Sequence, residues 1–210
     1  MSSNGREMSG IPFIVSAPSG AGKTTLCKKA VDFFANFRHS ISYTTRKPRP
    51  GEVNGVDYKF VDDAEFDRMI EWDEFIEHAG VYGRRYGTSQ ADLETLLSQG
   101  YDVILEIDVQ GAQSVRGKLK GGVSVFILPP SIEACEERLK GRGKDSPEEI
   151  QKRLRIAEAE IGKAPEYDYI IINDKLEEAF EIFKSIIIAE KAKTPKMLDK
   201  VEKLFGAYIK

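Results

Sequence analysis

Residues 11–35 constrain the fold more than any other part of the chain, because a short apolar run leads through a glycine-containing turn into a helical pattern. Residues 11–17 (IPFIVSA) are apolar and rich in β-formers, which is typical of a buried strand. From 22 to 35 the apolar residues, among them Leu26 and Ala30, follow helical spacing. The order strand, turn, helix predicts a βα unit at the start of the chain.

Similar patterns alternate along the rest of the sequence. Strands that are apolar throughout and alternate with helices are typical of a parallel sheet covered on both faces, and 210 residues suffice for one substantial core. We therefore predict the α/β class. The expected elements are a helix at 91–98, a strand at 102–108, a strand at 123–128, a helix at 131–140, a strand at 169–172 and a helix at 176–191.

Two segments interrupt this alternation. Residues 38–90 contain several short β-like stretches and one helix started by Asp62 and Asp63, which predicts a small inserted subdomain. Residues 138–164 include Ser146 as an expected N-cap before a helix with a charged surface, which suggests a lid. The expected division is a core at 11–37, 91–137 and 165–191, the inserted subdomain at 38–90, the lid at 138–164 and a basic, surface-docked helical tail at 192–210.

Residues 17–24 (APSGAGKT) match the phosphate loop GxxxxGK[ST], except that Ala17 stands in place of the first glycine. The segment follows a predicted strand and opens a helix, where free N–H groups and the helix dipole can hold phosphate. In that geometry Lys23 reaches the β and γ oxygens of a nucleotide and the Thr24 hydroxyl ligates Mg²⁺. A glycine-rich turn with a solvated lysine is the alternative interpretation.

Arginines gather in two other segments. Residues 42–51 (SYTTRKPRPG) present Arg46 and Arg49 on a loop stiffened by prolines, with no acidic residue. Taken alone, this loop is better interpreted as a solvated basic surface loop than as a binding site. A second group of arginines, Arg138, Arg142 and Arg153, lies around the predicted lid. Arginine forks suit phosphate groups, so the two groups together favour phosphoryl chemistry.

Glu106 and Asp108 close the predicted strand at 102–108, with their side chains on one face. The carboxyl ends of parallel strands are where such sheets bind ligands. A carboxylate there can hold Mg²⁺ or accept a hydrogen bond from a substrate, and Asp108 can also serve as a helix N-cap. The two roles can coexist.

Composition excludes several other classes. The net charge is -3, which argues against a protein that coats nucleic acid. Two cysteines and two histidines are too few for a disulfide framework or a zinc site, and no apolar run approaches the roughly 18 residues of a membrane helix. We expect a cytoplasmic protein in a reducing compartment. Trp72, Phe33 and Phe34 are interpreted as packing residues, and Cys27 as a buried small residue.

Five motifs, in this order, resemble those of the guanylate kinases, over residues 11–191. They are SAPSGAGKTTL at 16–26, SYTTRKPRPGEVNGVDY at 42–58, FIEHAGVYGRRYGTS at 75–89, LEIDVQGA at 105–112, and ERLKGRG with the later KRL. The resemblance implies a P-loop NTPase core, a mixed α+β GMP-binding subdomain at 38–90 and a helical lid. Ala17 in place of glycine and Glu106 in place of an aspartate of some members are the two departures.

The resemblance also implies roles for individual residues. Those expected to act on the migrating phosphoryl group are Lys23, Arg46, Arg138, Arg142 and Arg153. Those expected around ATP are Ala17, Pro18, Ser19, Gly20, Ala21, Gly22, Lys23, Thr24, Thr25, Arg142 and Asn173. Those expected around GMP are Ser42, Arg46, Arg49, Tyr58, Glu77, Tyr86, Thr88, Glu106 and Asp108, with contact of Glu106 or Asp108 to guanine or to Mg²⁺ left open.

Guanine offers N1–H and N2–H₂ donors beside an O6 acceptor, so a carboxylate from Glu77 with the hydroxyl of Thr88 or Ser42 matches it and disfavours adenine. The implied reaction is reversible transfer of the ATP γ-phosphoryl group to GMP or dGMP, which recycles GMP and supplies GTP and dGTP. The expected partners are ATP, GMP and Mg²⁺, with no nucleic acid, membrane or obligate protein partner.

Three alternative functions compete with this interpretation. A protein-binding module of the kind found in membrane-associated scaffold proteins is disfavoured because Lys23, Arg46 and Glu77 are all present. A kinase for another nucleotide is a further alternative. A GTPase is disfavoured because INDK at 172–175 is not an NKxD motif.

Overall fold

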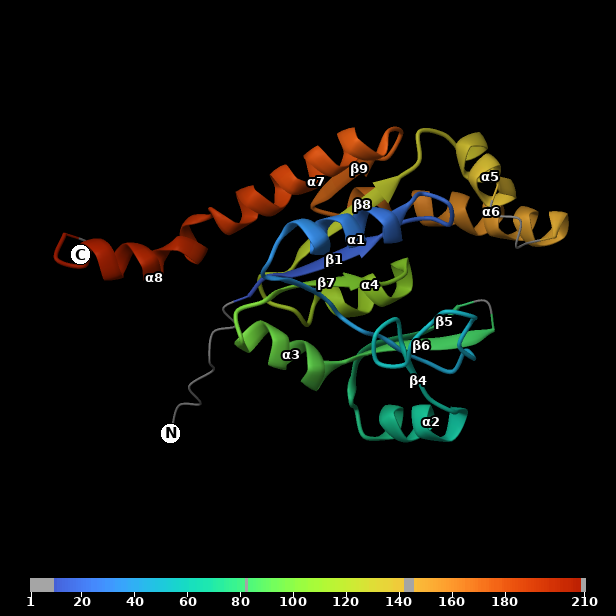
Figure 1. The fold of residues 1–210 in the computed structure, drawn as a ribbon, viewed down its shortest axis with the longest axis horizontal. Coiled ribbons are helices and arrows are strands. Elements are labelled where there is room, and N and C mark those ends of the chain that lie inside the picture. The colour runs from blue at the N-terminus through green and yellow to red at the C-terminus, as the bar shows by residue number, and fades with distance from the viewer. Residues whose placement is uncertain (1–9, 82, 142–145, 209–210) are drawn as a thin grey trace.

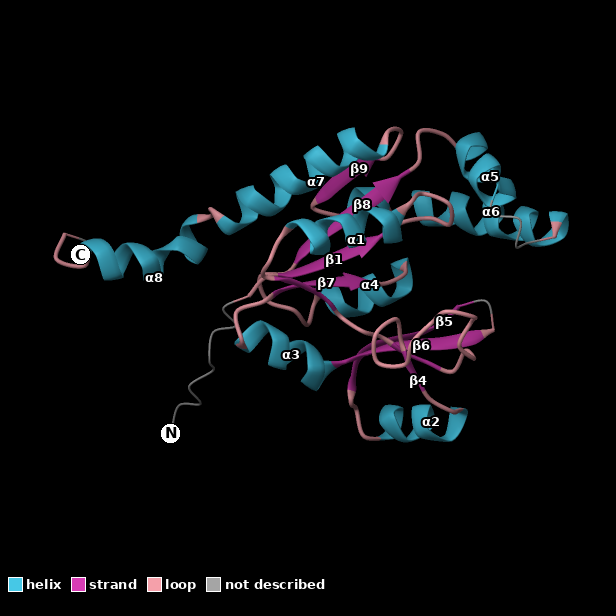
Figure 2. Cartoon of the chain, viewed as in Figure 1, coloured by secondary structure: helices cyan, strands magenta, loops and turns pink. Residues whose placement is uncertain are grey.

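The computed structural model describes residues 10–81, 83–141 and 146–208, and its described strands form two sheets (Figure 1, Figure 2). All strand pairs of the larger sheet are parallel, whereas the smaller sheet is mixed. In spatial order the larger sheet contains β2 (Phe37–His39), β7 (Asp102–Glu106), β1 (Pro12–Ser16), β8 (Val123–Leu128) and β9 (Tyr169–Ile172). The smaller sheet contains β4 (Lys59–Phe60), β3 (Tyr43–Thr44), β6 (Arg84–Ser89) and β5 (Phe75–Val81).

Helices connect the strands, and the α/β class with a parallel sheet is confirmed. They are α1 (Lys23–Phe33), α2 (Asp63–Glu71), α3 (Gln90–Ser98), α4 (Val109–Arg116), α5 (Ile132–Gly141), α6 (Pro147–Ile161), α7 (Leu176–Lys191) and α8 (Thr194–Phe205), with a short 3-10 turn at Ala164–Glu166.

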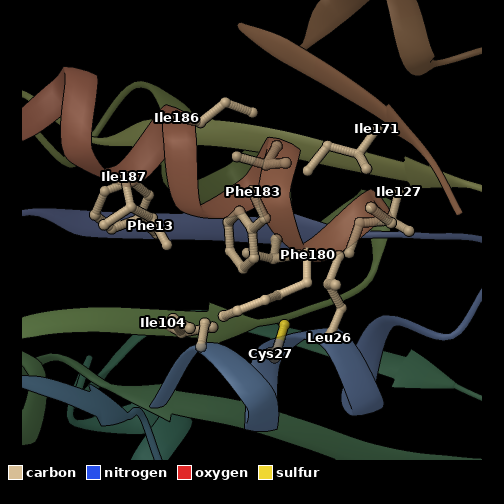
Figure 3. Packing of buried hydrophobic residues seen from close by; sticks show 14 of the residues in the cluster. Phe13, Leu26, Cys27, Ile104, Ile127, Ile171, Phe180, Phe183, Ile186 and Ile187 are labelled. Atoms are coloured by element: carbon tan, nitrogen blue, oxygen red, sulfur yellow. The ribbon is translucent and has the colours of Figure 1, made fainter. Parts of the chain in front are cut away.

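Both faces of the large sheet are covered, as the uniformly apolar strands predict. On one face, side chains from α1 and α7, such as Leu26 and Phe183, pack on β1 and β8 (Figure 3). On the other face, Leu97 of α3 and Val115 of α4 pack on side chains such as Leu105 of β7. Cys27 belongs to the first cluster and is fully buried, so its interpretation as a small core residue is confirmed.

The sheet order places the expected site residues at one edge. β1 lies at the centre, and its residue Val15 pairs with Glu106 of β7. The loop after β1 and the loop after β7 therefore leave the sheet side by side, at its carboxyl edge, where α/β proteins bind ligands. The motif at 17–24 and Asp108 stand in these two loops.

The two interrupting segments form separate structures. The smaller sheet and α2 lie below the large sheet in Figure 1, and Asp62 caps α2 by accepting a hydrogen bond from Glu65 N. α5 and α6 pack together through Leu139 and Ile150. The predicted capping box is present, since Ser146 and Glu149 exchange side-chain and backbone hydrogen bonds.

Two expectations, one about the tail and one about Trp72, are wrong. The tail does form a helix, but none of the residues of α8 is buried, and the helix extends beyond the body of the protein (Figure 1). Trp72 is 69% exposed with the Arg68 guanidinium over its ring, so it is not a packing residue of the core. Phe33 and Phe34 do pack as expected: the Phe33 ring contacts those of Phe34 and Phe180, and Phe34 packs against the first core cluster.

Within the described ranges, no helix combines the length and apolarity that a bilayer-crossing segment needs.

Asp102 joins three parts of the chain at the opposite edge of the large sheet. Its buried carboxylate accepts hydrogen bonds from the Ile11 backbone N at 2.9 Å, from Asn36 Nδ2 at 2.9 Å and from Lys191 Nζ at 2.6 Å. Replacing it with alanine leaves a buried N–H and a half-buried ammonium without their acceptor. We expect Asp102→Ala to lower the free energy of unfolding by about 2 kcal/mol.

Denaturant unfolding measures this loss, with the exposed Asp199 of α8 as the control. Asp199→Ala should stay within about 0.5 kcal/mol of the parent protein. Equal stability of the two variants would show that the Asp102 contacts contribute nothing.

Candidate active site

The loop between β1 and α1 has the backbone that a phosphate loop requires. Gly20 and Gly22 have φ of 89° and 88°, a region that favours glycine. A Cβ at Gly22 would also lie 2.4 Å from Nδ2 of Asn173. Ala17, which replaces the first glycine of the motif, has no positive φ, so alanine fits there without strain.

Neighbouring segments support this loop from behind. Asn173 Nδ2 donates to the Ala21 carbonyl at 2.7 Å, and the Cys135 thiol donates to the Ser19 carbonyl at 3.1 Å. Arg138 Nη2 in turn donates to the Asn173 carbonyl at 2.9 Å. The structure thus places Asn173 against the loop backbone and Arg138 against the Asn173 carbonyl, and neither lines the cavity that the loop encloses.

A cavity of about 300 Å³, which we call the loop cavity, opens in front of this turn. Its lining combines the loop with Asp108 and Gln110 at the start of α4 and with charged residues of α6. Lys23 Nζ donates to the Ile107 carbonyl at 3.1 Å. The described lining residues are Ala17, Pro18, Ser19, Gly20, Gly22, Lys23, Thr24, Thr25, Gly80, Asp108, Gln110, Arg153, Ile156 and Glu160.

A second cavity of about 150 Å³, the inner cavity, lies between the large sheet and the smaller one. It brings together six of the nine residues expected around GMP. Its described lining residues are Lys23, Ser42, Tyr58, Glu77, Ala79, Tyr86, Glu106, Ile107 and Asp108. Lys23 and Asp108 line both cavities, so the two spaces adjoin at these side chains.

Glu77 is positioned by the antiparallel pairing of β5 and β6, which sets it opposite Thr88. Thr88 Oγ1 donates to Glu77 Oε1 at 2.6 Å, and Glu77 is only 5% exposed. Burial raises the pKa of Glu77 to about 7, and the nearby Asp108 carboxylate adds to the rise, against the hydrogen bond from Thr88. Thr88 itself lies behind Glu77 and does not line the inner cavity.

The two carboxylates after β7 have different surroundings. The Thr24 hydroxyl donates to the Glu106 carboxylate, which brings Glu106 next to the phosphate loop. Asp108 Oδ1 accepts from Gly111 N at 2.8 Å and caps α4. Asp108 therefore has the expected capping role while it also lines both cavities.

Arg46 is held by a partner that the sequence did not reveal. Its guanidinium makes a two-pronged ion pair with Glu52, at 2.9 Å and 2.8 Å, and lies 5.2 Å from the Tyr58 ring centroid. Arg49 donates its backbone N to Glu52 and its side chain is exposed. Neither arginine lines the inner cavity in this conformation, although both stand on the loop beside Tyr58.

The lid contributes one expected residue and one unexpected residue. Arg153 of α6 lines the loop cavity, whereas Arg142 lies outside the described residues. Glu160, two turns after Arg153 on α6, lines the same cavity and was missed. Burial raises the pKa of Glu160 to about 7, against the attraction of the Lys23 ammonium. Its helical spacing from Arg153 was the signal that could have identified it.

The arrangement suits transfer of a phosphoryl group between two anionic ligands. One cavity offers backbone N–H groups and the Lys23 ammonium, and the other offers a buried carboxylate for a donor-bearing base. No group of three or more His, Cys, Asp or Glu side chains in the described ranges forms a ready metal site. The Thr24 hydroxyl and the Glu106 carboxylate are oxygen donors of the kind that Mg²⁺ prefers alongside nucleotide phosphates.

Comparison with known proteins gives consistent results. The guanylate kinase family model matches residues 9–190. A guanylate kinase of Geobacter sulfurreducens is 53% identical over 197 residues, which cover 94% of this chain and 97% of that protein. A guanylate kinase of Methylobacillus flagellatus is 47% identical over 94% of this chain and 100% of that protein.

A solved structure agrees with these sequence matches. The crystal structure of guanylate kinase from Anaplasma phagocytophilum superposes with a TM-score of 0.76 at 36% identity, over 92% of this chain and 94% of that one.

Proposed function

The chain belongs to the guanylate kinase family and phosphorylates GMP with ATP, and we propose that the loop cavity holds the ATP phosphates while the inner cavity holds GMP. The observation that carries this assignment is that Lys23 and Asp108 line both cavities. Two nucleotides bound in this way meet at their phosphates, next to the Lys23 ammonium.

In the proposed reaction an oxygen of the GMP phosphate attacks the γ-phosphorus of ATP, and the bond to the bridging oxygen of ADP breaks. The attacking oxygen is already anionic near neutral pH, so the site needs no strong general base. Lys23 and Arg153 neutralise the charge on the transferring group, and the backbone of the phosphate loop holds the β-phosphate. The reaction is reversible, since the same groups stabilise the transferring group in either direction.

Mg²⁺ fits this proposal through the Thr24 hydroxyl, with Glu106 beside it. The ion supplies charge neutralisation on the β and γ oxygens of ATP when it is bound. Thr24 orients its hydroxyl by the hydrogen bond to Glu106, and Lys23 reaches the same region from the first turn of α1.

We also propose that residues 38–90 act as the GMP-binding subdomain and residues 138–164 as the lid, with Arg46, Arg49, Arg138 and Arg142 brought to the phosphates as these parts close. Two observations support a closing motion before phosphoryl transfer. The Arg46 guanidinium is paired with Glu52 and the Arg138 guanidinium is bonded to backbone carbonyls, so both have to leave these partners to reach the phosphates. We also propose that dGMP is a substrate, because the assigned contacts are made to the base and the phosphate, which GMP and dGMP share. We place the activity in the cytoplasm, with no nucleic acid or membrane as partner.

A bisubstrate analogue tests the two-cavity assignment. Adenosine and guanosine joined by five phosphates should inhibit competitively against both ATP and GMP, and should bind more tightly than either nucleotide alone. The matched compound with two adenosines should bind far more weakly. Competition against ATP but not GMP would refute the assignment of the inner cavity.

The pKa of Glu77 makes a further prediction. Only the ionised carboxylate can accept from both guanine N1–H and N2–H₂, so kcat/KM for GMP should rise with pH through about 7 and level off above it. The GMP phosphate itself titrates near pH 6 and adds a lower step. Steady-state kinetics from pH 5.5 to 8.5 measure both steps, and the Glu77→Gln variant should lose only the upper one. An unchanged profile in that variant would contradict the assignment.

A further inference from the structure

Gly111 stands in the first turn of α4, directly against the Glu77 carboxylate. A Cβ at Gly111 would lie 2.5 Å from Glu77 Oε2 and 3.2 Å from Asp108 Oδ1. Both carboxylates line the inner cavity, Glu77 from within β5 and Asp108 from the loop after β7. Because Gly111 has no side chain, the Glu77 and Asp108 carboxylates can occupy this space.

The backbone does not explain glycine at this position. Gly111 is helical and has no positive φ, so any residue can adopt its conformation. Glycine destabilises a helix interior relative to alanine, because the unfolded chain loses more freedom. The atoms nearest to the missing Cβ are carboxylate oxygens and not backbone, so close packing of main chains is not the reason either.

The carboxylate of Glu77 is the group that would have to move if a side chain were added. It is the end of a flexible side chain, so the fold itself can tolerate the change. Its present position, however, is set by the 2.6 Å hydrogen bond from Thr88 and by nearly complete burial. A methyl group at Gly111 requires a shift of about 1 Å to restore van der Waals contact. A shift of this size is enough to misalign a binding group.

We propose that Gly111 is a positioning residue for base selection: by having no side chain, it lets the Glu77 carboxylate lie beside Asp108 where it can receive the N1–H and N2–H₂ donors of a 6-oxo-2-aminopurine. This inference rests on the proposed role of Glu77. It adds a helix position that never touches the nucleotide and still sets which purine is accepted.

The test is Gly111→Ala, with Gly117→Ala as the matched control. Gly117 is the C-cap of the same helix with φ of -81°, and a Cβ there meets nothing within 4 Å. We expect Gly111→Ala to lower kcat/KM for GMP by about 100-fold, with the KM for ATP within about twofold and the melting temperature unchanged or raised. Gly117→Ala should match the parent protein in kcat/KM for GMP, in the KM for ATP and in melting temperature.

Two further readouts separate positioning from a structural effect. IMP lacks the 2-amino group, so the preference for GMP over IMP should narrow in Gly111→Ala. In a Glu77→Asp background the shorter side chain leaves room for the new methyl group. The penalty of Gly111→Ala should therefore be smaller there than in the parent protein.

The inference would be overturned if Gly111→Ala kept kcat/KM for GMP within twofold of the parent value. It would also be overturned if Gly111→Ala lowered kcat/KM for GMP as much in the Glu77→Asp background as in the parent protein. If Glu77→Gln lowers kcat/KM for GMP but Gly111→Ala does not, only the proposed role of Gly111 is wrong. If Glu77→Gln leaves kcat/KM for GMP unchanged, the proposed base-reading role of Glu77 is wrong, and the inference about Gly111 is wrong with it.

Discussion

Lys23→Ala should lower kcat by about a hundredfold or more while leaving the fold intact. The Lys23 ammonium lines both cavities and donates to the Ile107 carbonyl at 3.1 Å, so in the proposed complex it lies where the phosphates of the two nucleotides meet. Charge develops there in the transition state, and loss of one preorganised donor at such a point typically costs this much. A coupled assay of ADP formation at saturating ATP and GMP measures the loss.

The control for this variant is Lys28→Ala, which removes an exposed lysine from the same helix. It should keep the parent kcat within about twofold. Equal melting temperatures for the two variants would show that the loss in Lys23→Ala is not caused by unfolding. If Lys23→Ala kept the parent kcat, the assignment of the phosphate loop as the catalytic centre would be wrong.

Glu77→Gln should lower kcat/KM for GMP by about a hundredfold, with the KM for ATP nearly unchanged. A carboxylate accepts from both N1–H and N2–H₂ of guanine, whereas an amide must turn its own N–H₂ toward one of them. The unmatched polar groups are buried, since Glu77 is 5% exposed, so the penalty is large. The preference for GMP over AMP should narrow for the same reason.

Glu71→Gln is the control for this prediction, because Glu71 is an exposed carboxylate on α2 in the same subdomain. It should leave kcat/KM for GMP unchanged. A parallel rise of the KM for ATP in Glu77→Gln would point to a general disturbance of the site and away from base reading.

Local patterns predicted the parts of the site that lie within one segment. The phosphate loop follows from a strand, a turn and a helix in sequence, and the left-handed Gly22 stands where the motif has its second glycine. The capping of α4 by Asp108 is also local. The parallel sheet was predictable because apolar strands alternate with helices, and the packing on both faces confirms it.

Contacts that depend on the folded path of the chain were not predictable from residue patterns. The pairing of Arg46 with Glu52 depends on the shape of one loop, and the contact of Cys135 with Ser19 joins α5 to the phosphate loop, far apart in sequence. Residue types in a single sequence do not encode such distances. The docking of α8 was wrongly expected, since the residue types of a basic helix do not show whether it packs on the rest of the protein.

The roles of individual residues stay predictions that the kinetics above will decide. The structure places Ser42, Tyr58, Glu77 and Tyr86 around one cavity, which is compatible with the roles implied by the resemblance. Asn173 instead contacts the Ala21 carbonyl of the phosphate loop, and Arg138 contacts the Asn173 carbonyl. The proposed action of Arg138 on the phosphoryl group requires closure of the lid.

The most direct test of the account is an assay of ADP formation with ATP, Mg²⁺ and each of GMP, dGMP, AMP, CMP and UMP. We expect turnover with GMP and dGMP, and values of kcat/KM at least about a hundredfold lower with the other three, because in the proposed complex the buried Glu77 carboxylate faces the base. Absence of GMP-dependent ADP formation, or equal turnover with AMP, would contradict the account.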